Sequence, residues 1–244
     1  VYVYKRSGST WSLQTALMGP FAIGERLNYK SVAIDSDNMA VSFLIDSRVY
    51  NPETFNYEGG EIYYGVHVFT LSADTWSYTQ TIVSPHPYYQ DGQSTVAVAI
   101  KGEYMAVGWP YSQDTTNIDH TGSVSIYRIS MNGEWELHTS LVNPHHYQWS
   151  WYGEALSFSG NRLLVGAYGD DVIAEYKGTV YLYELNNSAW LFKRTIASPN
   201  TAGSEGFGYR LTLDGNDALI YEYYDYTIPG TWQANAYVFD LSNA

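Results

Sequence analysis

Hydrophobic and polar residues alternate along short stretches of this chain, and the alternation recurs in similar blocks. In each block two apolar runs flank a short turn of Gly, Asn, Asp or Ser. A period of two with many β-branched residues is typical of β-strands, and such tight turns join antiparallel pairs. No segment shows the 3.6-residue period of an amphipathic helix, so the pattern predicts an all-β fold. The four hairpin segments are SVAIDSDNMAV from Ser31, AVAIKGEYMAV from Ala97, ALSFSGNRLLV from Ala155 and RLTLDGNDALI from Arg210.

Two further strands accompany each hairpin. One is an alternating aromatic segment, with copies at 1–4, 66–69, 124–127, 180–183 and 236–239. The other begins with a tryptophan and ends at a proline, and its tryptophans are 55 to 65 residues apart. We expect each tryptophan to pack where neighbouring units meet and each proline to stop its strand. These repeat anchors are Trp11, Trp76, Trp135 and Trp190, with Pro20, Pro85, Pro144 and Pro199.

Antiparallel units of four strands and this length are typical of the blades of a β-propeller. The sequence therefore predicts one propeller, or a segment of one, over residues 1–244. The first repeat holds third and fourth strands, and the last holds first to third strands. The predicted repeats are 1–27, 28–84, 92–143, 152–198 and 207–244.

Short glycine motifs flank these strands. Tyr152-Gly153 and Phe207-Gly208 precede first strands, and Val165-Gly166-Ala167-Tyr168 ends a second strand. With Val107-Gly108-Trp109-Pro110, they resemble FG-GAP repeats, which form the propeller of integrin α subunits. The resemblance covers essentially the whole chain, although the motif is degenerate in the first, second and last repeats. It implies a propeller of an extracellular or cell-surface protein.

The predicted strands number 17, one more than four complete blades contain. Three interpretations stay open. The terminal strands pair with another subunit, the chain is a window on a longer array, or four blades close with one strand left over. Exposed strand edges are normally removed when a propeller closes on itself. Under the first two interpretations, another subunit or further blades would cover these edges instead.

Charge and composition exclude several classes of binding partner and of site. The chain has 12 Lys and Arg against 25 Asp and Glu, a net charge of −13, which argues against nucleic acid and anionic lipid. No apolar run is long enough for a membrane-spanning helix, so no membrane insertion is expected. The absence of cysteine excludes disulfides, thiolate metal sites and cysteine nucleophiles.

Candidate chemistry is sparse. No ordered catalytic motif such as G-x-S-x-G occurs, so no catalytic residue is assigned and the chain is expected not to be an enzyme. The calcium loop of integrin-type repeats has shrunk to short turns and does not carry over. Asp170, Asp171 and Glu175 lie in one loop and are a candidate calcium site, and ordinary solvated loop charge is the alternative.

Aromatic residues are abundant in the connections between repeats. Such rings either line a shared binding surface or fill the wedges between blades. The candidate binding residues are Tyr88, Tyr89, Trp149, Trp151, Tyr152 and Tyr224. The expected function is that of an extracellular, non-enzymatic module for protein interaction, adhesion or self-assembly through its terminal strands. The alternative is a lectin that binds glycans.

Overall fold

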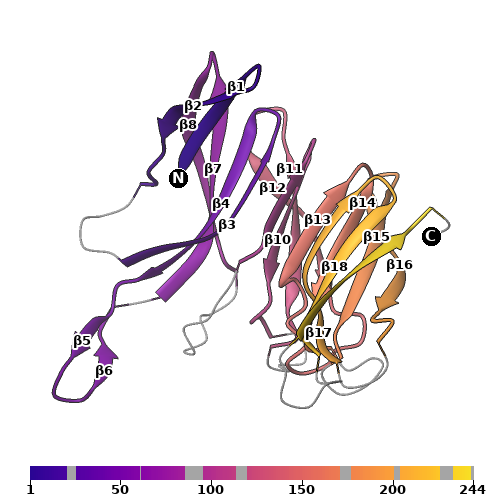
Figure 1. Ribbon diagram of the computed structural model, residues 1–244. Coiled ribbons are helices and arrows are strands. Elements are labelled where there is room, and N and C mark those ends of the chain that lie inside the picture. The colour runs from indigo at the N-terminus through magenta and orange to yellow at the C-terminus, as the bar shows by residue number, and fades with distance from the viewer. Residues whose placement is uncertain are drawn as a thin grey trace.

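The computed structural model describes residues 1–20, 26–60, 62–85, 96–113, 120–170, 177–200, 204–225 and 233–242. The described residues form antiparallel sheets and contain no α-helix (Figure 1). Five of the sheets stand side by side as successive units of the repeat. The fold is an all-β propeller of four-stranded antiparallel blades, as the sequence predicted.

Three of these sheets have four strands each. The second blade contains β3 (Arg26–Asp35), β4 (Asn38–Asp46), β7 (Ile62–Ser72) and β8 (Thr75–Val83). The third contains β9 (Val98–Lys101), β10 (Tyr104–Trp109), β11 (Ser123–Ile129) and β12 (Trp135–Val142). The fourth contains β13 (Ala155–Ser159), β14 (Arg162–Ala167), β15 (Thr179–Asn186) and β16 (Ala189–Ala197).

The two end sheets are smaller. The first pairs β1 (Tyr2–Ser7) with β2 (Thr10–Ala16), and the last contains β17 (Ser204–Asp214), β18 (Asp217–Asp225) and β19 (Gln233–Asp240). These are the third and fourth strands of one unit and the first three strands of another. A separate ribbon, which the sequence pattern did not predict, pairs β5 (Val49–Asn51) with β6 (Asn56–Glu58) in the β4–β7 connection.

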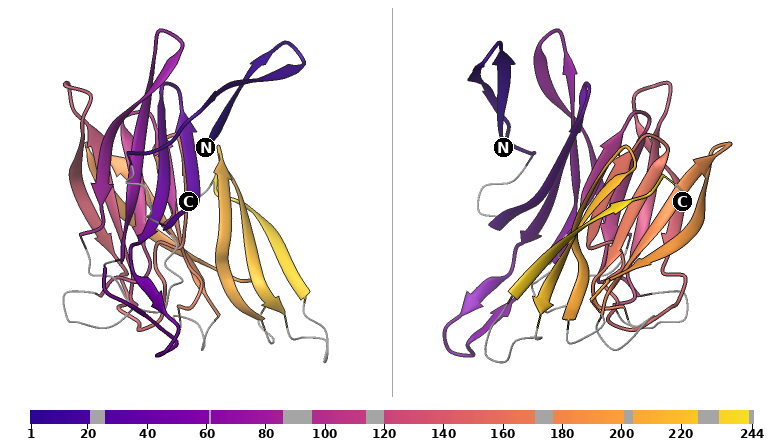
Figure 2. Two further views of the ribbon diagram at one scale, coloured as in Figure 1. Left: turned by 90° about the vertical axis from the view of Figure 1, so that its left-hand side faces the viewer. Right: turned by 45° about the vertical axis from the view of Figure 1, so that its right-hand side comes forward.

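The first strands of successive blades lie next to one another. β3 contacts β9, β9 contacts β13, and β13 contacts β17, which places these strands on the inner side of the row of blades (Figure 2). Glycines permit this closeness. A Cβ on Gly166 at the end of β14 would overlap the backbone carbonyl of Gly208 in β17, so the FG-GAP-like glycines allow backbones of adjacent blades to touch.

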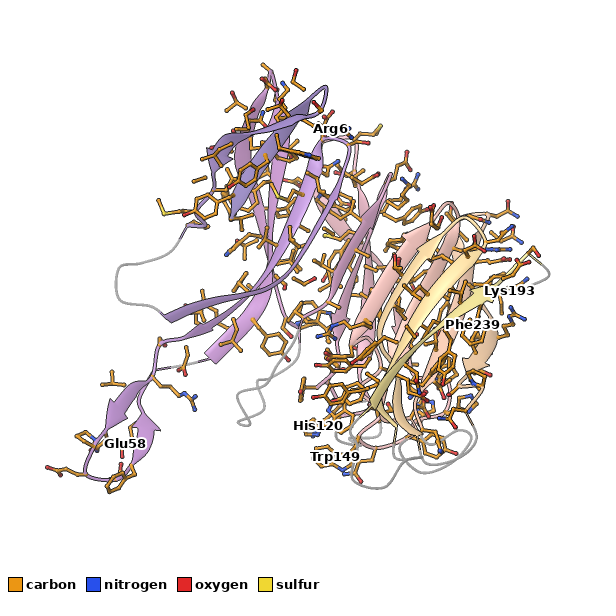
Figure 3. The ribbon with its side chains drawn as sticks, viewed as in Figure 1. Arg6, Glu58, His120, Trp149, Lys193 and Phe239 are labelled. Carbon is orange, nitrogen blue, oxygen red and sulfur yellow. The ribbon has the colours of Figure 1, made fainter. Side chains whose placement is uncertain are left out.

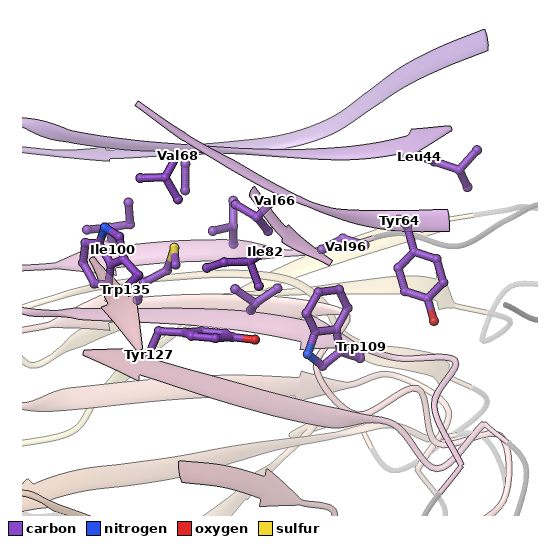
Figure 4. Packing of buried hydrophobic residues seen from close by; sticks show 14 residues of the cluster. Leu44, Tyr64, Val66, Val68, Ile82, Val96, Ile100, Trp109, Tyr127 and Trp135 are labelled. Carbon is purple, nitrogen blue, oxygen red and sulfur yellow. The ribbon is translucent and has the colours of Figure 1, made fainter. Parts of the chain in front are cut away.

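The core consists of separate layers between blades. Along β15, Val180 and Leu182 pack toward the last blade, whereas Tyr181 and Tyr183 pack toward the third. This alternation is the period-two pattern of the sequence expressed on two buried faces. Figure 4 shows the corresponding layer between the second and third blades, in which Trp135 and Ile100 of the third blade face Val68 of the second.

The repeat anchors occupy comparable places with one exception. Trp76, Trp135 and Trp190 are buried against the preceding blade, but Trp11 is exposed because no blade precedes its sheet in the described chain. The four prolines Pro20, Pro85, Pro144 and Pro199 are exposed in bends or turns just after fourth strands.

Candidate functional site

Seven aromatic side chains form a continuous series at the loop end of the last three blades. We call this series the aromatic ladder. Figure 3 shows His120 and Trp149 together at this end of the molecule. Three members come from two loops, one between β10 and β11 and one between β12 and β13. The others come from β17, β18 and the ends of β10 and β14. The ladder consists of Tyr111, His120, Trp149, Trp151, Tyr168, Tyr209 and Tyr223.

The rings meet at favourable aromatic geometries. His120 stacks on Trp149 with centroids 4.1 Å apart, and Trp151 stacks on Tyr168 at 4.7 Å. Trp149 and Trp151 join these two stacks at 6.0 Å. Tyr168 meets Tyr209 edge-on at 5.2 Å, which continues the series into the last blade. Stacked and edge-on pairs at these separations attract one another beyond simple area burial.

The ladder is only partly open to solvent. His120 and Tyr111 are buried, and Trp151, Tyr168 and Tyr209 are half-buried. Trp149 and Tyr223, which belong to different blades, are each 39% exposed. The arrangement therefore offers two accessible rings, backed by a row of packed rings that holds them in place.

The backbone beneath the ladder is strained. Trp149 has a φ of +61°, Trp151 of +48° and His120 of +55°. The left-handed region is uncommon for non-glycine residues and unfavourable for bulky ones. Each such residue costs about 1–3 kcal/mol and persists only when its surroundings enforce it, and such strain gathers at binding and catalytic sites.

A buried polar network enforces this conformation. Ser150, between the two tryptophans, donates a hydrogen bond to the carbonyl of Thr121 at 2.7 Å. Asn143 Nδ2 donates to Ser150 Oγ at 2.8 Å and to Asp170 Oδ2 at 3.0 Å. The Tyr181 hydroxyl donates to Asn143 Oδ1 at 3.1 Å and also bonds Asp170. Because these groups are buried, breaking one bond would leave a polar atom without compensation, so the network fixes the loop firmly.

Gly169 closes the loop from the other side. A Cβ at this position would overlap the carbonyl oxygen of Trp149 and the ring of Trp151. The Gly169 amide also donates to the carbonyl of Ser150 at 3.3 Å. Glycine is therefore required here for the two tryptophans to lie where they do.

Charged groups lie next to the ladder. The guanidinium of Arg210 lies 4.1 Å from the ring centroid of Tyr209, and its Nη1 is 3.2 Å from Oε1 of the buried Glu154. Both residues line a cleft of about 320 Å³ along the first strands, together with Ser31, Val96 and Leu156. Burial raises the pKa of the Tyr168 hydroxyl, and the nearby Glu154 carboxylate raises it further. Tyr168 therefore stays a neutral phenol near this ion pair.

The aromatic candidates predicted from the sequence have different locations. Trp149 and Trp151 belong to the ladder. Tyr152 is fully buried: its hydroxyl donates to that of Tyr183 at 2.7 Å, and burial raises its pKa well above the usual value, so its ring forms core rather than surface. Tyr224 lies in β18, but its side chain is outside the described part of the chain, and so are both Tyr88 and Tyr89.

Five ladder residues were not among the predicted binding residues. They are Tyr111, His120, Tyr168, Tyr209 and Tyr223. Tyr168 is the last residue of one glycine motif of the repeat and Tyr209 directly follows another, which was the available signal. No feature of the sequence indicated His120. It lies in an acidic loop, and its stacking partner Trp149 comes 29 residues later in the chain.

The candidate calcium loop is only partly described. Asp170 is fully buried and bonded to Asn143 and Tyr181, whereas Asp171 and Glu175 lie outside the described residues. Within the described ranges no group of three or more acidic or histidine side chains is arranged to hold a metal. Calcium binding by this loop stays a prediction. In the same ranges no helix is long and apolar enough to cross a membrane.

Comparison with known proteins gives structural matches only. No family model matches the chain, and no curated protein matches it. One similar solved structure is a protein from Lactobacillus plantarum, at 14% identity and a TM-score of 0.47, covering 95% of this chain and 59% of that one. Another is a mutant Trypanosoma rangeli sialidase displaying trans-sialidase activity, at 11% identity and a TM-score of 0.46, covering 96% of this chain and 40% of that one. The chain thus spans less than two thirds of either protein.

The second of these structures corrects one expectation. The chain was expected not to be an enzyme because its sequence has no ordered catalytic motif. A sialidase is an enzyme, and its similarity to this chain contradicts that exclusion, which was wrong. Catalytic groups are recognised by their geometry in the fold, so their spacing in sequence need not form a motif. The similarity assigns no reaction to this chain.

Proposed function

We propose that this chain is an extracellular β-propeller module of FG-GAP type that binds a protein partner through the aromatic ladder. The extracellular assignment rests on the resemblance of its glycine motifs to FG-GAP repeats. The binding assignment rests on one observation above all: Trp149 and Trp151 are held in a strained backbone conformation by a buried polar network.

Such an arrangement suits binding for an energetic reason. A ring that is already fixed loses little conformational entropy when a partner covers it, so more of its contact energy contributes to affinity. Tyrosine and tryptophan are the residues most enriched among those that dominate protein interfaces. Because Trp149 and Tyr223 expose their rings from different blades, a partner contacting both would span the last three blades. The net charge of −13 favours a partner with a basic surface.

A glycan is the second candidate partner, and a separate observation favours it. The ladder runs beside Glu154 and Arg210, which line the inner cleft, and the neutral phenol of Tyr168 is close to both. Sugars combine apolar ring faces with many hydroxyl groups, so stacked rings next to hydrogen-bonding groups suit them.

The test is the binding of fluorescently labelled protein to a panel of cultured cells, compared with Trp149→Ala and Gly169→Ala. The first variant removes an exposed ring, and the second displaces both tryptophans while leaving every ring present. We expect each to weaken cell binding at least about tenfold, the loss typical of a residue that dominates an interface. Phe55→Ala is the matched control, because Phe55 is an exposed ring between β5 and β6, far from the ladder.

Treatment of the cells separates the two partners. Loss of binding after protease treatment, with retention after periodate oxidation of glycans, supports a protein partner. The reverse pattern, with signal on a glycan array, supports the lectin. Equal binding by folded wild type, Trp149→Ala and Gly169→Ala would refute a function for the ladder.

A further inference from the structure

The four sheets that contain a third and a fourth strand share one irregularity, which makes their residues comparable one by one. The register between these strands shifts just before the fourth residue of the aromatic segment in each sheet. The residue after the shift pairs with the residue two positions beyond the anchor tryptophan. The equivalent positions are Tyr4, Phe69, Tyr127 and Tyr183, and their anchors are Trp11, Trp76, Trp135 and Trp190.

In the first sheet, at one end of the row of blades, these positions are exposed to solvent. Trp11 is 63% exposed, whereas its three equivalents are between 3% and 8% exposed against the preceding blade. Tyr4 is 55% exposed, and its equivalents are between 1% and 7% exposed. Tyr2 is exposed in the same way. We call Tyr2, Tyr4 and Trp11 the N-terminal face, and it has the composition of the bulky aromatic half of a blade interface.

At the other end the opposite half of an interface is open. The pairs Ala40–Val68, Ala106–Ile126 and Leu164–Leu182 link second and third strands, and each is fully buried against the following blade. Leu219–Val238 is the equivalent pair in the last blade. Here Val238 is 73% exposed and Leu219 is 43% exposed. We call these two residues the C-terminal face.

The two faces match each other in the kinds of residue that they carry. Each inner interface joins an aromatic face to a small aliphatic face, and the end faces are one of each kind. Arg6 lies two residues after Tyr4 in β1, with its guanidinium 5.9 Å from the ring centroid of Trp11, whereas Asp240 lies two residues after Val238 in β19 and pairs with Asp217. Lys5 points to the other side of β1, where its Nζ is 2.6 Å from Oδ1 of Asp74. A cationic residue on the N-terminal face thus corresponds to an acidic pair beside the C-terminal face.

We propose that copies of this chain associate head to tail, with the N-terminal face of one copy packed on the C-terminal face of a second copy. The second copy is the occupant that the structure favours, because it supplies the same type of surface that covers the equivalent residues in the inner blades. A heterologous contact of this kind forms rings when its rotation closes and filaments when it does not. This inference is independent of the aromatic ladder, which lies on the loop end of the blades.

The test measures mass in solution by light scattering over a range of protein concentrations. The mass of the wild-type protein is expected to rise above the 27.5 kDa of one chain as its concentration increases. Trp11→Glu and Val238→Glu each place a charge on one face at an exposed position, so both variants should fold with an unchanged circular dichroism spectrum. Each variant alone has one intact face that finds no complement, and is expected to stay at 27.5 kDa.

An equimolar mixture of the two variants is the decisive sample. The Trp11→Glu copy keeps its C-terminal face and the Val238→Glu copy keeps its N-terminal face, so the mixture should form a complex of twice 27.5 kDa and nothing larger. Met131→Glu, at an exposed turn, and Trp149→Ala, in the ladder, are the controls and should assemble as wild type does. Wild type at 27.5 kDa at every concentration, or a mixture that stays at 27.5 kDa, would overturn the proposal.

Discussion

The interfaces between blades and the loop face at their end are both built from aromatic rings, but the rings are held in different ways. In the interfaces, Trp76, Trp135 and Trp190 lie in regular strands and are buried by the next sheet. On the loop face, Trp149 and Trp151 lie in left-handed backbone and depend on buried hydrogen bonds. The first arrangement repeats from blade to blade and stabilises the fold. The second occurs once in the described chain, which is the expected behaviour of a site carried by loops on a rigid scaffold.

The largest effect is expected from breaking an inner interface. Trp135→Ala removes a ring packed between the second and third blades. Gln80 can still hydrogen-bond both the amide and the carbonyl of residue 135, because those groups belong to the backbone. We expect a loss of about 3–5 kcal/mol in the free energy of unfolding, as for other buried large-to-Ala changes. Denaturant unfolding measures this loss.

Trp11→Ala is the matched comparison at dilutions where the chain is monomeric. It removes the equivalent ring from an exposed position, so we expect a change within about 0.5 kcal/mol. Equal losses for the two variants would show that the exposed face of β2 is covered within one chain.

The second prediction concerns a titratable group in the second blade. His67 stacks on Phe43 at 4.1 Å and its Nδ1 is 2.8 Å from Thr81 Oγ1. Burial lowers its pKa from 6.5 to about 4, because the charged form loses its hydration. The unfolded chain therefore binds more protons between these values, and stability is full above pH 6.5 and falls as pH drops toward 4.

The size of this pH effect follows from the shift. At 1.36 kcal/mol per pKa unit, protonation of His67 costs up to about 3 kcal/mol of stability by pH 4. Unfolding of wild type and His67→Gln is compared at pH 7 and at pH 4.5. The variant should lose less stability than wild type over this interval, and an equal loss would place the acid sensitivity elsewhere.

The sequence predicted the interfaces far better than the loop face. The spacing of Trp11, Trp76, Trp135 and Trp190 sufficed for the strands and blades, because one local rule repeats along the chain. It did not show that Trp11 is exposed, since the ring is buried only when a blade precedes it. On the loop face, the stacking of His120 on Trp149 and of Tyr168 on Trp151 joins separate loops, and no local pattern encodes such contacts.

A smaller loss is expected from the network that supports the ladder. Tyr181→Phe removes the hydroxyl that bonds Asn143 and Asp170, and so leaves buried polar atoms with fewer partners. We expect about 1–3 kcal/mol of destabilisation. Tyr78→Phe is the control, because Tyr78 is an exposed ring whose hydroxyl bonds Thr81, and it should change stability by less than about 0.5 kcal/mol. Weakened ladder binding by Tyr181→Phe alone would show that the network positions the tryptophans.

The smallest effect compares the same backbone strain in the two regions. Asn187 and Ser188 both have positive φ values, +47° and +68°, in the exposed turn between β15 and β16. Two positive φ values favour an Asn-Gly turn, so Ser188→Gly should stabilise the fold by about 0.5 kcal/mol and leave partner binding unchanged.

Trp149→Gly relieves the same kind of strain at a φ of +61°, but it removes the ring that the strained backbone presents. We expect it to abolish partner binding whatever its effect on unfolding, which is followed in the same denaturant titration. If Trp149→Gly bound its partner as wild type does, the strain beneath the ladder would be no more functional than that of the hairpin turn. If binding is lost while Ser188→Gly binds normally, then left-handed backbone serves the blades as a turn and the loop face as a support for an exposed ring.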